Sequence, residues 1–294
     1  MTQQHPFDER FLKKLRLLEV DFRRSQSQNA EGSLSSMQLG GRGEFSDHRT
    51  YTPGDDTRYL DWNVYARTDR FFTKQFHKRQ QHRMAILLDA SASMSCGTPS
   101  KYSFGAQVAA AIAFVTLAGE NMVSIATFAA NRIRWSGTAH SHSDFPLVLN
   151  TLETTEAKGR TSLQQGIREL ITRHPRPCLV VLLSDLLDEQ DARRKLGALA
   201  AKGFEIDVIH VLSPEEIDPS ICGNHVLRDI ETQDTLMLSI DPRLQSLYSR
   251  ELNKFVDGWR NFCDSHHMLY FLASTSTPFE RLIFDCFRRG GLLK

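Results

Sequence analysis

From residue 83 onward, short apolar runs alternate with longer segments of helical periodicity. Strand-length runs are found at residues 84–89, 122–128, 178–184, 204–211 and 268–272. The first four are apolar on both faces, as parallel strands covered by helices on both sides must be. Helical segments are predicted between the runs at residues 102–119, 143–154, 162–174, 189–202 and 242–265. This alternation predicts an α/β fold with a doubly wound, mostly parallel sheet.

The first part of the chain has a different pattern. Apolar residues at helical spacing predict an N-terminal amphipathic helix over residues 8–24. Residues 24–43 are rich in Ser, Gln, Asn and Gly, which is the composition of a mobile loop. Aromatic and β-prone residues around a Pro-Gly-Asp turn signal predict short antiparallel strands within residues 44–82. We therefore expect a helix, loop and β-rich extension at 1–82 and an α/β domain with C-terminal helices at 83–294.

Charge, cysteine content and hydropathy exclude several classes of protein. Lys and Arg total 36 and Asp and Glu total 35, so no net charge favours nucleic acid or an anionic membrane. The five cysteines form no CxxC pair, which argues against a disulfide framework or a zinc site. The longest apolar run, residues 108–119, is too short for a bilayer of about 30 Å, and the N-terminus lacks a signal-peptide pattern. We expect a cytoplasmic protein without a transmembrane segment.

Polar side chains follow two of the predicted strands at the point where each strand ends. Asp89, Ser91 and Ser93 form a D-x-S-x-S sequence directly after the first run. Asp185 ends another run, and Thr161 stands at the start of a predicted helix. Ligands of open α/β sheets bind beyond the carboxyl ends of the strands. These five oxygen donors suit Mg²⁺ or Mn²⁺ and suit zinc poorly, so they predict a metal site.

Two interpretations of this site remain open from the residues alone. In the simpler one, D-x-S-x-S is a polar loop whose Asp caps the next helix. In the other, the metal is held mainly by neutral hydroxyls and keeps strong Lewis acidity. An acidic residue of a protein partner would then complete its coordination. The second interpretation predicts a binding device rather than a catalyst.

The same five positions resemble the metal-ion-dependent adhesion site of von Willebrand factor A domains. Asp89, Ser91 and Ser93 resemble its first loop. Thr161 resembles its second loop and Asp185 its third. The resemblance implies a von Willebrand factor A-like fold for this part of the chain, and a non-enzymatic protein-binding module that holds Mg²⁺ or Mn²⁺.

A second resemblance covers nearly the whole chain. The sequence motifs that carry it are GEF at 43–45, RTYTPGDDTR at 49–58, DW at 61–62, AR at 66–67 and RRGGL at 288–292. They are similar to the hallmark run and the ending of domain-of-unknown-function family 58. Members of that family resemble partners of MoxR-type AAA+ ATPases, and many carry an N-terminal transmembrane hairpin that this sequence lacks. The resemblance implies a soluble adaptor or co-factor of such an ATPase in protein maturation or complex assembly.

The run around residues 49–67 has two interpretations. Pro fixes one backbone angle, Gly permits a positive one, and the following acids accept backbone N–H bonds, so the run is typical of a turn. Alternatively, its charged and aromatic residues form a partner-docking face, because Trp and Arg dominate interface energetics. The docking candidates are Asp55, Asp56, Arg58, Asp61, Trp62 and Arg67. Basic residues at 67–83 interleaved with Phe could also form a strand that binds nucleic acid. A ribbon with a solvated basic face is favoured instead, and no nucleic-acid partner is expected.

Enzyme activity is not expected. A phosphate-transfer nucleophile at Asp89, as in haloacid dehalogenase-like phosphatases, needs an acid/base two positions later. Ser91 occupies that position and cannot titrate near neutral pH. The His140-x-His142-x-Asp144 sequence is interpreted as a surface loop, and no serine-hydrolase elbow or phosphate-binding P-loop sequence occurs. A metal-dependent phosphoesterase or other hydrolase that uses Asp89 remains the alternative.

Overall fold

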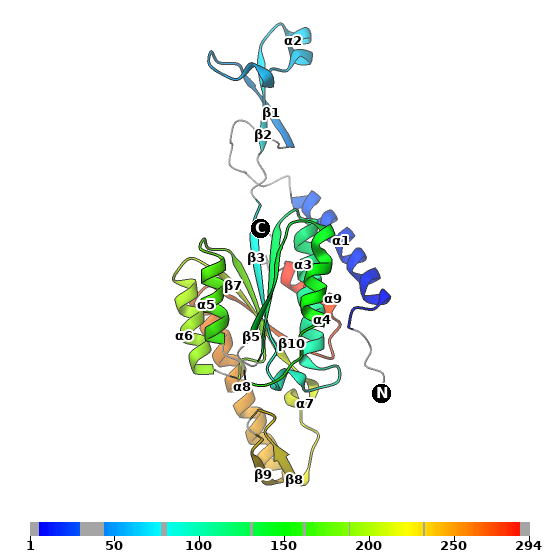
Figure 1. Ribbon diagram of the computed structural model, residues 1–294, viewed down its shortest axis with the longest axis vertical. Coiled ribbons are helices and arrows are strands. Elements are labelled where there is room, and N and C mark those ends of the chain that lie inside the picture. Colours follow the sequence, from blue (N-terminus) through cyan, green and yellow to red (C-terminus); the bar gives the residue numbers. More distant parts are fainter. Residues whose placement is uncertain are drawn as a thin grey trace. The chain divides into compact units, whose positions relative to one another are not determined.

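The computed structural model forms two compact units, Met1–Arg23 with His82–Lys294, and Arg24–Gln81 (Figure 1). The structure describes residues 6–29, 44–77, 81–129, 132–160, 163–187, 189–231 and 233–288. The first 23 residues belong to the α/β unit, whereas the sequence grouped them with the extension. Their apolar side chains explain the difference, because they pack into the α/β core as described below.

A six-stranded sheet forms the centre of the α/β unit (Figure 1). Its strands are β3 (Arg83–Asp89), β4 (Met122–Ala129), β5 (Arg132–Ala139), β6 (Leu179–Ser184), β7 (Glu205–Leu212) and β10 (Leu269–Ser274). They lie in the order β10-β7-β6-β3-β4-β5, and the edge strand β5 alone pairs antiparallel. In chain order this is the doubly wound arrangement 3-2-1-4-5-6. The predicted fold class, an α/β fold with a mostly parallel sheet, is confirmed.

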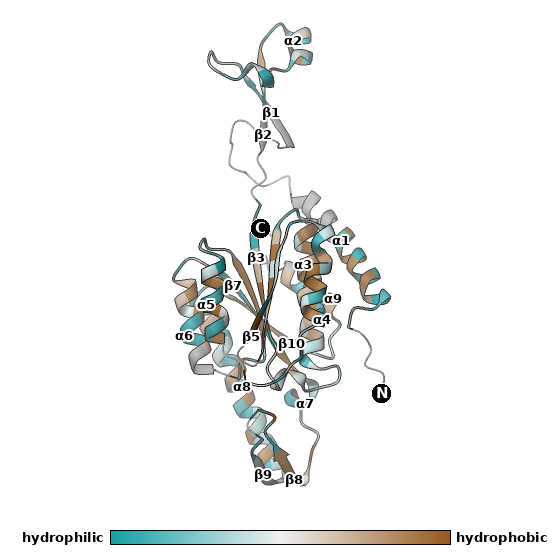
Figure 2. Cartoon of the chain, viewed as in Figure 1, coloured by the Kyte–Doolittle hydropathy of each residue, from teal (hydrophilic) through white to brown (hydrophobic). Residues whose placement is uncertain are grey.

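Helices cover both faces of the sheet, and two apolar clusters fill the two interfaces (Figures 1 and 2). One face carries α1 (Glu9–Asn29), α3 (Lys101–Ala118), α4 (Phe145–Glu153) and α9 (Phe279–Arg288). The other carries α5 (Leu163–Arg173), α6 (Glu189–Ala200) and α8 (Pro242–Ser265). Along β3, Ile86 and Leu88 belong to the first cluster and Ala85 and Leu87 to the second. This alternation explains why the strand had to be apolar throughout.

α3 is the central helix of the first face. By length and composition it is apolar enough to cross a membrane, but most of it is buried inside the unit. It packs against β3, β4, α4 and α9. A helix that is covered on all sides by protein needs apolar residues all round, so its composition follows from its place in the core.

α1 packs on the α/β unit through one apolar stripe. Phe11, Leu15 and Leu18 are buried, and the Phe11 ring lies 5.2 Å from that of Phe279. Asp8 caps the first turn by accepting a 2.8 Å hydrogen bond from the Phe11 backbone N–H. The helix continues to Asn29, so the loop predicted from residue 24 was wrong for its first six residues. The rest of that predicted loop, residues 30–43, lies outside the described residues, as does the family-like ending after Arg288.

The second unit is a small antiparallel ribbon with a helical excursion. β1 (Glu44–Thr50) pairs with β2 (Phe72–His77), as the antiparallel prediction required. Between them lie η1 (Thr57–Tyr59) and α2 (Trp62–Thr68), which the sequence pattern did not predict. α2 ends at Asp69, whose φ of 54° is the left-handed conformation that commonly closes helices.

A further hairpin follows β7 in the α/β unit. After α7 (Pro214–Ile217), β8 (Gly223–Arg228) and β9 (Thr235–Ile240) form a two-stranded antiparallel sheet. This hairpin was not predicted either. It connects to the start of α8, and its turn carries Asp229, Ile230 and Glu231 toward the strand ends of the main sheet.

Candidate metal centre

The carboxyl ends of β3 and β6 meet at Asp89. One Asp89 carboxylate oxygen accepts a 2.9 Å hydrogen bond from the Ser91 backbone N–H. The other accepts a 2.7 Å bond from the hydroxyl of Ser184, the last residue of β6. The Ser91 and Ser93 hydroxyl oxygens lie 2.9 Å apart, and all these side chains are buried. These hydrogen bonds therefore hold the carboxylate of Asp89 and the hydroxyls of Ser91 and Ser93 close together at the ends of the strands.

Asp185, directly after β6, is paired with a buried lysine. The ammonium group of Lys101 lies 2.8 Å from the Asp185 carboxylate and 2.5 Å from that of Glu216. Burial alone would lower the pKa of Lys101, but the two carboxylates outweigh it and raise that pKa above its usual value. Lys101 is fully buried and remains charged, so it supplies a fixed positive charge beside the strand ends. Sequence reasoning missed this residue.

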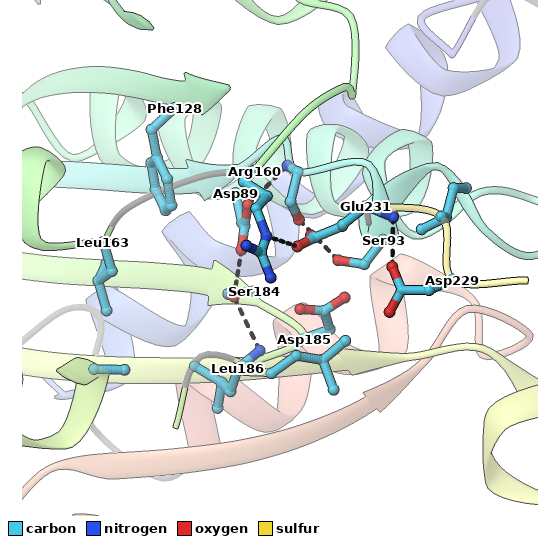
Figure 3. A pocket seen from close by; sticks show the side chains of 14 residues that line it. Asp89, Ser93, Phe128, Arg160, Leu163, Ser184, Asp185, Leu186, Asp229 and Glu231 are labelled. Carbon is cyan, nitrogen blue, oxygen red and sulfur yellow. Dashed lines mark hydrogen bonds and ion pairs between the residues drawn. The ribbon is translucent and has the colours of Figure 1, made fainter. Parts of the chain in front are cut away.

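Four of the five predicted metal ligands line one cavity of about 590 Å³ (Figure 3). They are Asp89, Ser91, Ser93 and Asp185. The fifth, Thr161, lies outside the described residues, although its neighbours Arg160 and Leu163 line the same cavity. The structure thus brings together the described members of the set from two separate loops.

Part of the cavity lining comes from the unpredicted hairpin. Asp229, Ile230 and Glu231 line it from the turn between β8 and β9. The Arg160 guanidinium lies 3.6 Å from the Glu231 carboxylate, and Arg160 is largely exposed (Figure 3). This side of the cavity is therefore charged and open to solvent. An exposed ion pair of this kind contributes little free energy, so it does little to hold the cavity closed.

The electrostatics of the cavity favour an additional positive charge. Burial raises the pKa of Asp89, and the nearby negative charge of Asp185 raises it further. A cation between the two carboxylates would relieve both effects. Lys101 supplies one positive charge at Asp185. Two carboxylates and two hydroxyls are hard oxygen donors, so their chemistry fits Mg²⁺ or Mn²⁺.

The donor set is poor in charged ligands. No group of three or more His, Cys, Asp or Glu side chains is placed to hold a metal ion within the parts of the chain that the structure describes. A cation here would depend on hydroxyl groups, on water and on a carboxylate that Lys101 already shares. This composition disfavours zinc, which binds through His and Cys.

In the second unit, the predicted docking acids hold local turns. Asp55 accepts 3.0 Å hydrogen bonds from the backbone N–H and the hydroxyl of Thr52, and these bonds lower its pKa. Asp56 caps η1 and binds the Arg58 guanidinium. Asp61 caps α2 through the backbone N–H groups of its first turn. The turn interpretation of this run therefore has a direct structural basis.

The two remaining docking candidates are exposed. Trp62 has 62% of its surface accessible, and its ring packs edge-on against Tyr65 at 6.1 Å. Arg67 donates a 3.2 Å hydrogen bond from Nε to the Asn63 carbonyl. A docking role for these two residues stays a prediction.

The His140-x-His142-x-Asp144 sequence forms a capped turn. The Asp144 carboxylate accepts hydrogen bonds from the backbone N–H groups of His140 and Ser141 at 2.9 and 3.1 Å. The His142 ring packs edge-on against Phe114 at 4.6 Å. These contacts give the three residues a structural role in starting α4.

The chain is similar in sequence to one protein family and to several mycobacterial proteins. The model of the family described as "Protein of unknown function DUF58" matches residues 47–254. The uncharacterized proteins Rv1480 of Mycobacterium tuberculosis (strain ATCC 25618 / H37Rv) and Mb1516 of Mycobacterium bovis are each 30% identical over 249 residues. Each alignment covers 83% of this chain and 78% of the relative.

Solved structures with a similar course of the chain include BatB from Bacteroides thetaiotaomicron and the SpRpn10 VWA domain. BatB is 17% identical with a TM-score of 0.44, and the comparison covers 71% of this chain and 98% of BatB. The SpRpn10 domain is 14% identical with a TM-score of 0.43, covering 72% and 97% of the two chains. Both scores are low, so the fold rests on the strand order given above. By its sequence match, the chain belongs to the DUF58 family.

Proposed function

We propose that this protein is a non-enzymatic, metal-dependent protein-binding module. The observation that carries the proposal is the meeting of Asp89, Ser91, Ser93 and Asp185 at one solvent-accessible cavity. These residues, with Thr161, would hold Mg²⁺ or Mn²⁺. A bound ion would supply a Lewis-acidic position for a carboxylate donated by the partner. The protein residues fix the donors in place and leave the cavity mouth accessible.

The residues around the cavity support binding rather than proton transfer. No His or Cys is among its described lining residues, and Ser91 stands where a second catalytic acid would be needed. Hydroxyls of this kind do not titrate near neutral pH, so they are poor general acids or bases. The set is suited to orienting a ligand.

The hairpin beside the cavity supports a protein as the ligand. Val226, Leu236 and Met237 expose 61%, 58% and 81% of their surface, and Ile230 at the turn exposes 41%. Val226 lies opposite Met237 in the ladder, so their side chains share one face. Leu236 lies opposite Leu227, and this exposed apolar pair occupies the other face. Exposed apolar side chains on a hairpin are suited to contacts with another protein. The turn of the same hairpin lines the cavity of the candidate metal centre. The apolar surface of the hairpin is therefore continuous with the charged lining of that cavity.

The partner that we propose is a MoxR-type AAA+ ATPase, on the strength of the family resemblance. The chain would act in the cytoplasm as an adaptor or co-factor in protein maturation or complex assembly. An acidic residue of the partner would face the cavity, and apolar residues would contact the hairpin.

The test is capture of a purified MoxR-type AAA+ ATPase from the same organism by wild-type chain, Asp89→Ala and Asp257→Ala. Asp257 is an exposed acid of α8 paired with Arg260, and it serves as the matched control. Capture is expected from the wild type and the control but not from Asp89→Ala. Because chelation also strips the ATPase of Mg²⁺, the comparison between variants at constant Mg²⁺ decides. Equal capture by Asp89→Ala would contradict the proposal, and phosphoester turnover lost in Asp89→Asn would instead favour a hydrolase.

A further inference from the structure

A second cavity of about 640 Å³ opens beside the edge of the sheet. It lies between the ends of β4 and β5 and the loop that follows α4. Its charged lining residues are Arg132, Arg134, Lys158 and Glu156, and its other lining residues are three threonines. It shares no lining residue with the cavity of the candidate metal centre.

The charge of this cavity is strongly one-sided. Three cationic side chains less one carboxylate leave a formal charge of +2, whereas the whole chain of 294 residues carries only +1. A phosphate monoester carries a charge of about −1.5 to −2 at neutral pH. A single carboxylate would neutralise half of the excess, and a phosphoryl dianion would neutralise all of it.

Hydrogen bonds within the protein fix several of the side chains that line the cavity. Arg134 donates a 2.8 Å hydrogen bond from Nη1 to the carbonyl of Thr154, which is the C-cap of α4. This bond orients the guanidinium plane, whose remaining N–H groups have the fork geometry that suits phosphate oxygens. The hydroxyl of Thr127, a buried lining residue, lies 2.7 Å from that of Thr155. These contacts hold Arg134, Thr127 and Thr155 in defined positions along the cavity.

Lys158 is the third cationic residue that lines the cavity. Its ammonium group pairs with Glu156 at 2.5 Å, but both side chains are more than two-thirds exposed. Exposed pairs of this kind contribute little, so a dianion in the cavity can replace Glu156 as the partner of Lys158. The Lys158 backbone N–H donates a 3.0 Å bond to the Ala90 carbonyl, which fixes the loop on the end of β3.

We propose that this cavity binds a phosphoryl group. Arg132, Arg134 and Lys158 supply the charge, and the guanidinium forks recognise the oxygens. The cavity is larger than a phosphate ion, so it also accommodates part of the molecule that carries the group. That molecule is either a mononucleotide or a phosphorylated side chain of a protein, which share this chemistry. The proposal does not depend on the metal centre or on its partner.

The experiment uses the full chain in chelator-containing buffer, so that no divalent metal contributes. Inorganic phosphate, AMP and a phosphoserine peptide are titrated while the backbone amide signals of residues 154–158 are followed by NMR. The matched negative probes are adenosine and the unphosphorylated peptide. Saturable shifts are expected with the phosphorylated probes only. AMP binding more tightly than inorganic phosphate would assign the site to nucleotides, and tighter peptide binding would assign it to phosphorylated proteins.

Variants test whether the cations are responsible. Arg132→Gln and Arg134→Gln should each weaken binding of the phosphorylated probe about tenfold, as expected for a lost charge-assisted hydrogen bond. Arg132→Lys keeps the charge and should retain most of the affinity, and Arg250→Gln, an exposed arginine of α8, should bind as the wild type does. Because Arg134 also contacts Thr154, Arg132→Gln is the cleaner test if Arg134→Gln unfolds. No saturable shift, or equal binding by Arg132→Gln and wild type, would overturn the proposal.

Discussion

The α/β unit and the ribbon unit at Arg24–Gln81 are stabilised in opposite ways. In the α/β unit, β3 is buried along its whole length after Arg83, with apolar side chains on both faces. Between residues 47 and 74 of the ribbon unit, the buried residues are Asp61 and Thr73, and both are polar. One unit therefore rests on the hydrophobic effect and the other on hydrogen bonds, ion pairs and aromatic contacts.

Asp61 illustrates how the ribbon unit is held. Its carboxylate lies 2.9 Å from His48 Nε2 of β1 and 3.4 Å from the Lys74 ammonium of β2, and it caps α2. The Tyr65 and Phe71 rings stack at 4.5 Å between α2 and β2. A small sheet with so little apolar burial has a narrow stability margin. We expect local changes to loosen this unit, whereas the α/β unit responds only to changes in its core.

The largest effect is expected at Lys101, whose buried charge lies between two carboxylates of the α/β unit. Lys101→Met removes the cation that faces Asp185 and Glu216 and leaves buried carboxylate charge uncompensated. Breaking one side of a buried pair costs about 3–5 kcal/mol, so the free energy of unfolding should fall by about 4 kcal/mol. Urea unfolding followed by circular dichroism measures this loss.

The matched control is Lys254→Met. Lys254 pairs with Glu251 on the exposed side of α8, with more than half of each side chain accessible. No measurable change in stability is expected there. If Lys101→Met proved as stable as Lys254→Met, the contrast between buried and exposed charge in this unit would be refuted.

The next effect tests the assignment of α1 to the α/β core. Leu15→Ala empties a fully buried position and should lower the free energy of unfolding by about 3 kcal/mol, as for other large-to-small core changes. Leu17 lies on the same helix and is 67% exposed. Leu17→Ala should stay within about 0.5 kcal/mol of the wild type. Equal effects of the two substitutions in thermal unfolding would show that α1 does not pack as described.

The smallest effect is confined to the ribbon unit and depends on pH. The hydrogen bond with His48 lowers the pKa of Asp61 to about 2 from an ordinary value of 3.8, with further help from α2 backbone N–H groups and Lys74. A lowered pKa stabilises the fold above the unfolded-state value, and this contribution is lost as the pH falls through about 2. NMR titration of the Asp61 carboxyl carbon should therefore give a midpoint near pH 2, and a higher one in His48→Asn. A wild-type midpoint near 4 would rule out the network.

Sequence analysis could predict the α/β fold because its strands are buried on both faces. A continuous apolar run of strand length, such as the one that ends at Asp89, must be covered on both faces, and this requires helices on both sides of a sheet. The same argument placed Asp89 and Asp185 at the ends of two strands, since parallel strands end at one edge of a sheet. That these two strands are neighbours is known only from the structure. Their meeting at one cavity follows from this rule and not from either motif alone.

Other features left no comparable signal. The β8 and β9 strands are mostly exposed on both faces, so their side chains show no apolar-polar alternation. α2 has only seven residues, too few for helical periodicity, and its aromatic residues are typical of strands. Lys101 meets its two carboxylates across 84 and 115 residues of sequence, which no local pattern reveals. The only local hint was a lysine at the start of an otherwise uncharged helix.

The central claim is that Asp89 and its neighbours hold one hard divalent cation, and Mn²⁺ binding followed by electron paramagnetic resonance tests it most directly. The account predicts one bound Mn²⁺ per wild-type chain, displaced by excess Mg²⁺ and absent in Asp89→Ala. Asp257→Ala, with its exposed carboxylate removed, should bind as the wild type does. Mn²⁺ that stays free beside the wild-type chain, or that binds Asp89→Ala equally well, would contradict the claim.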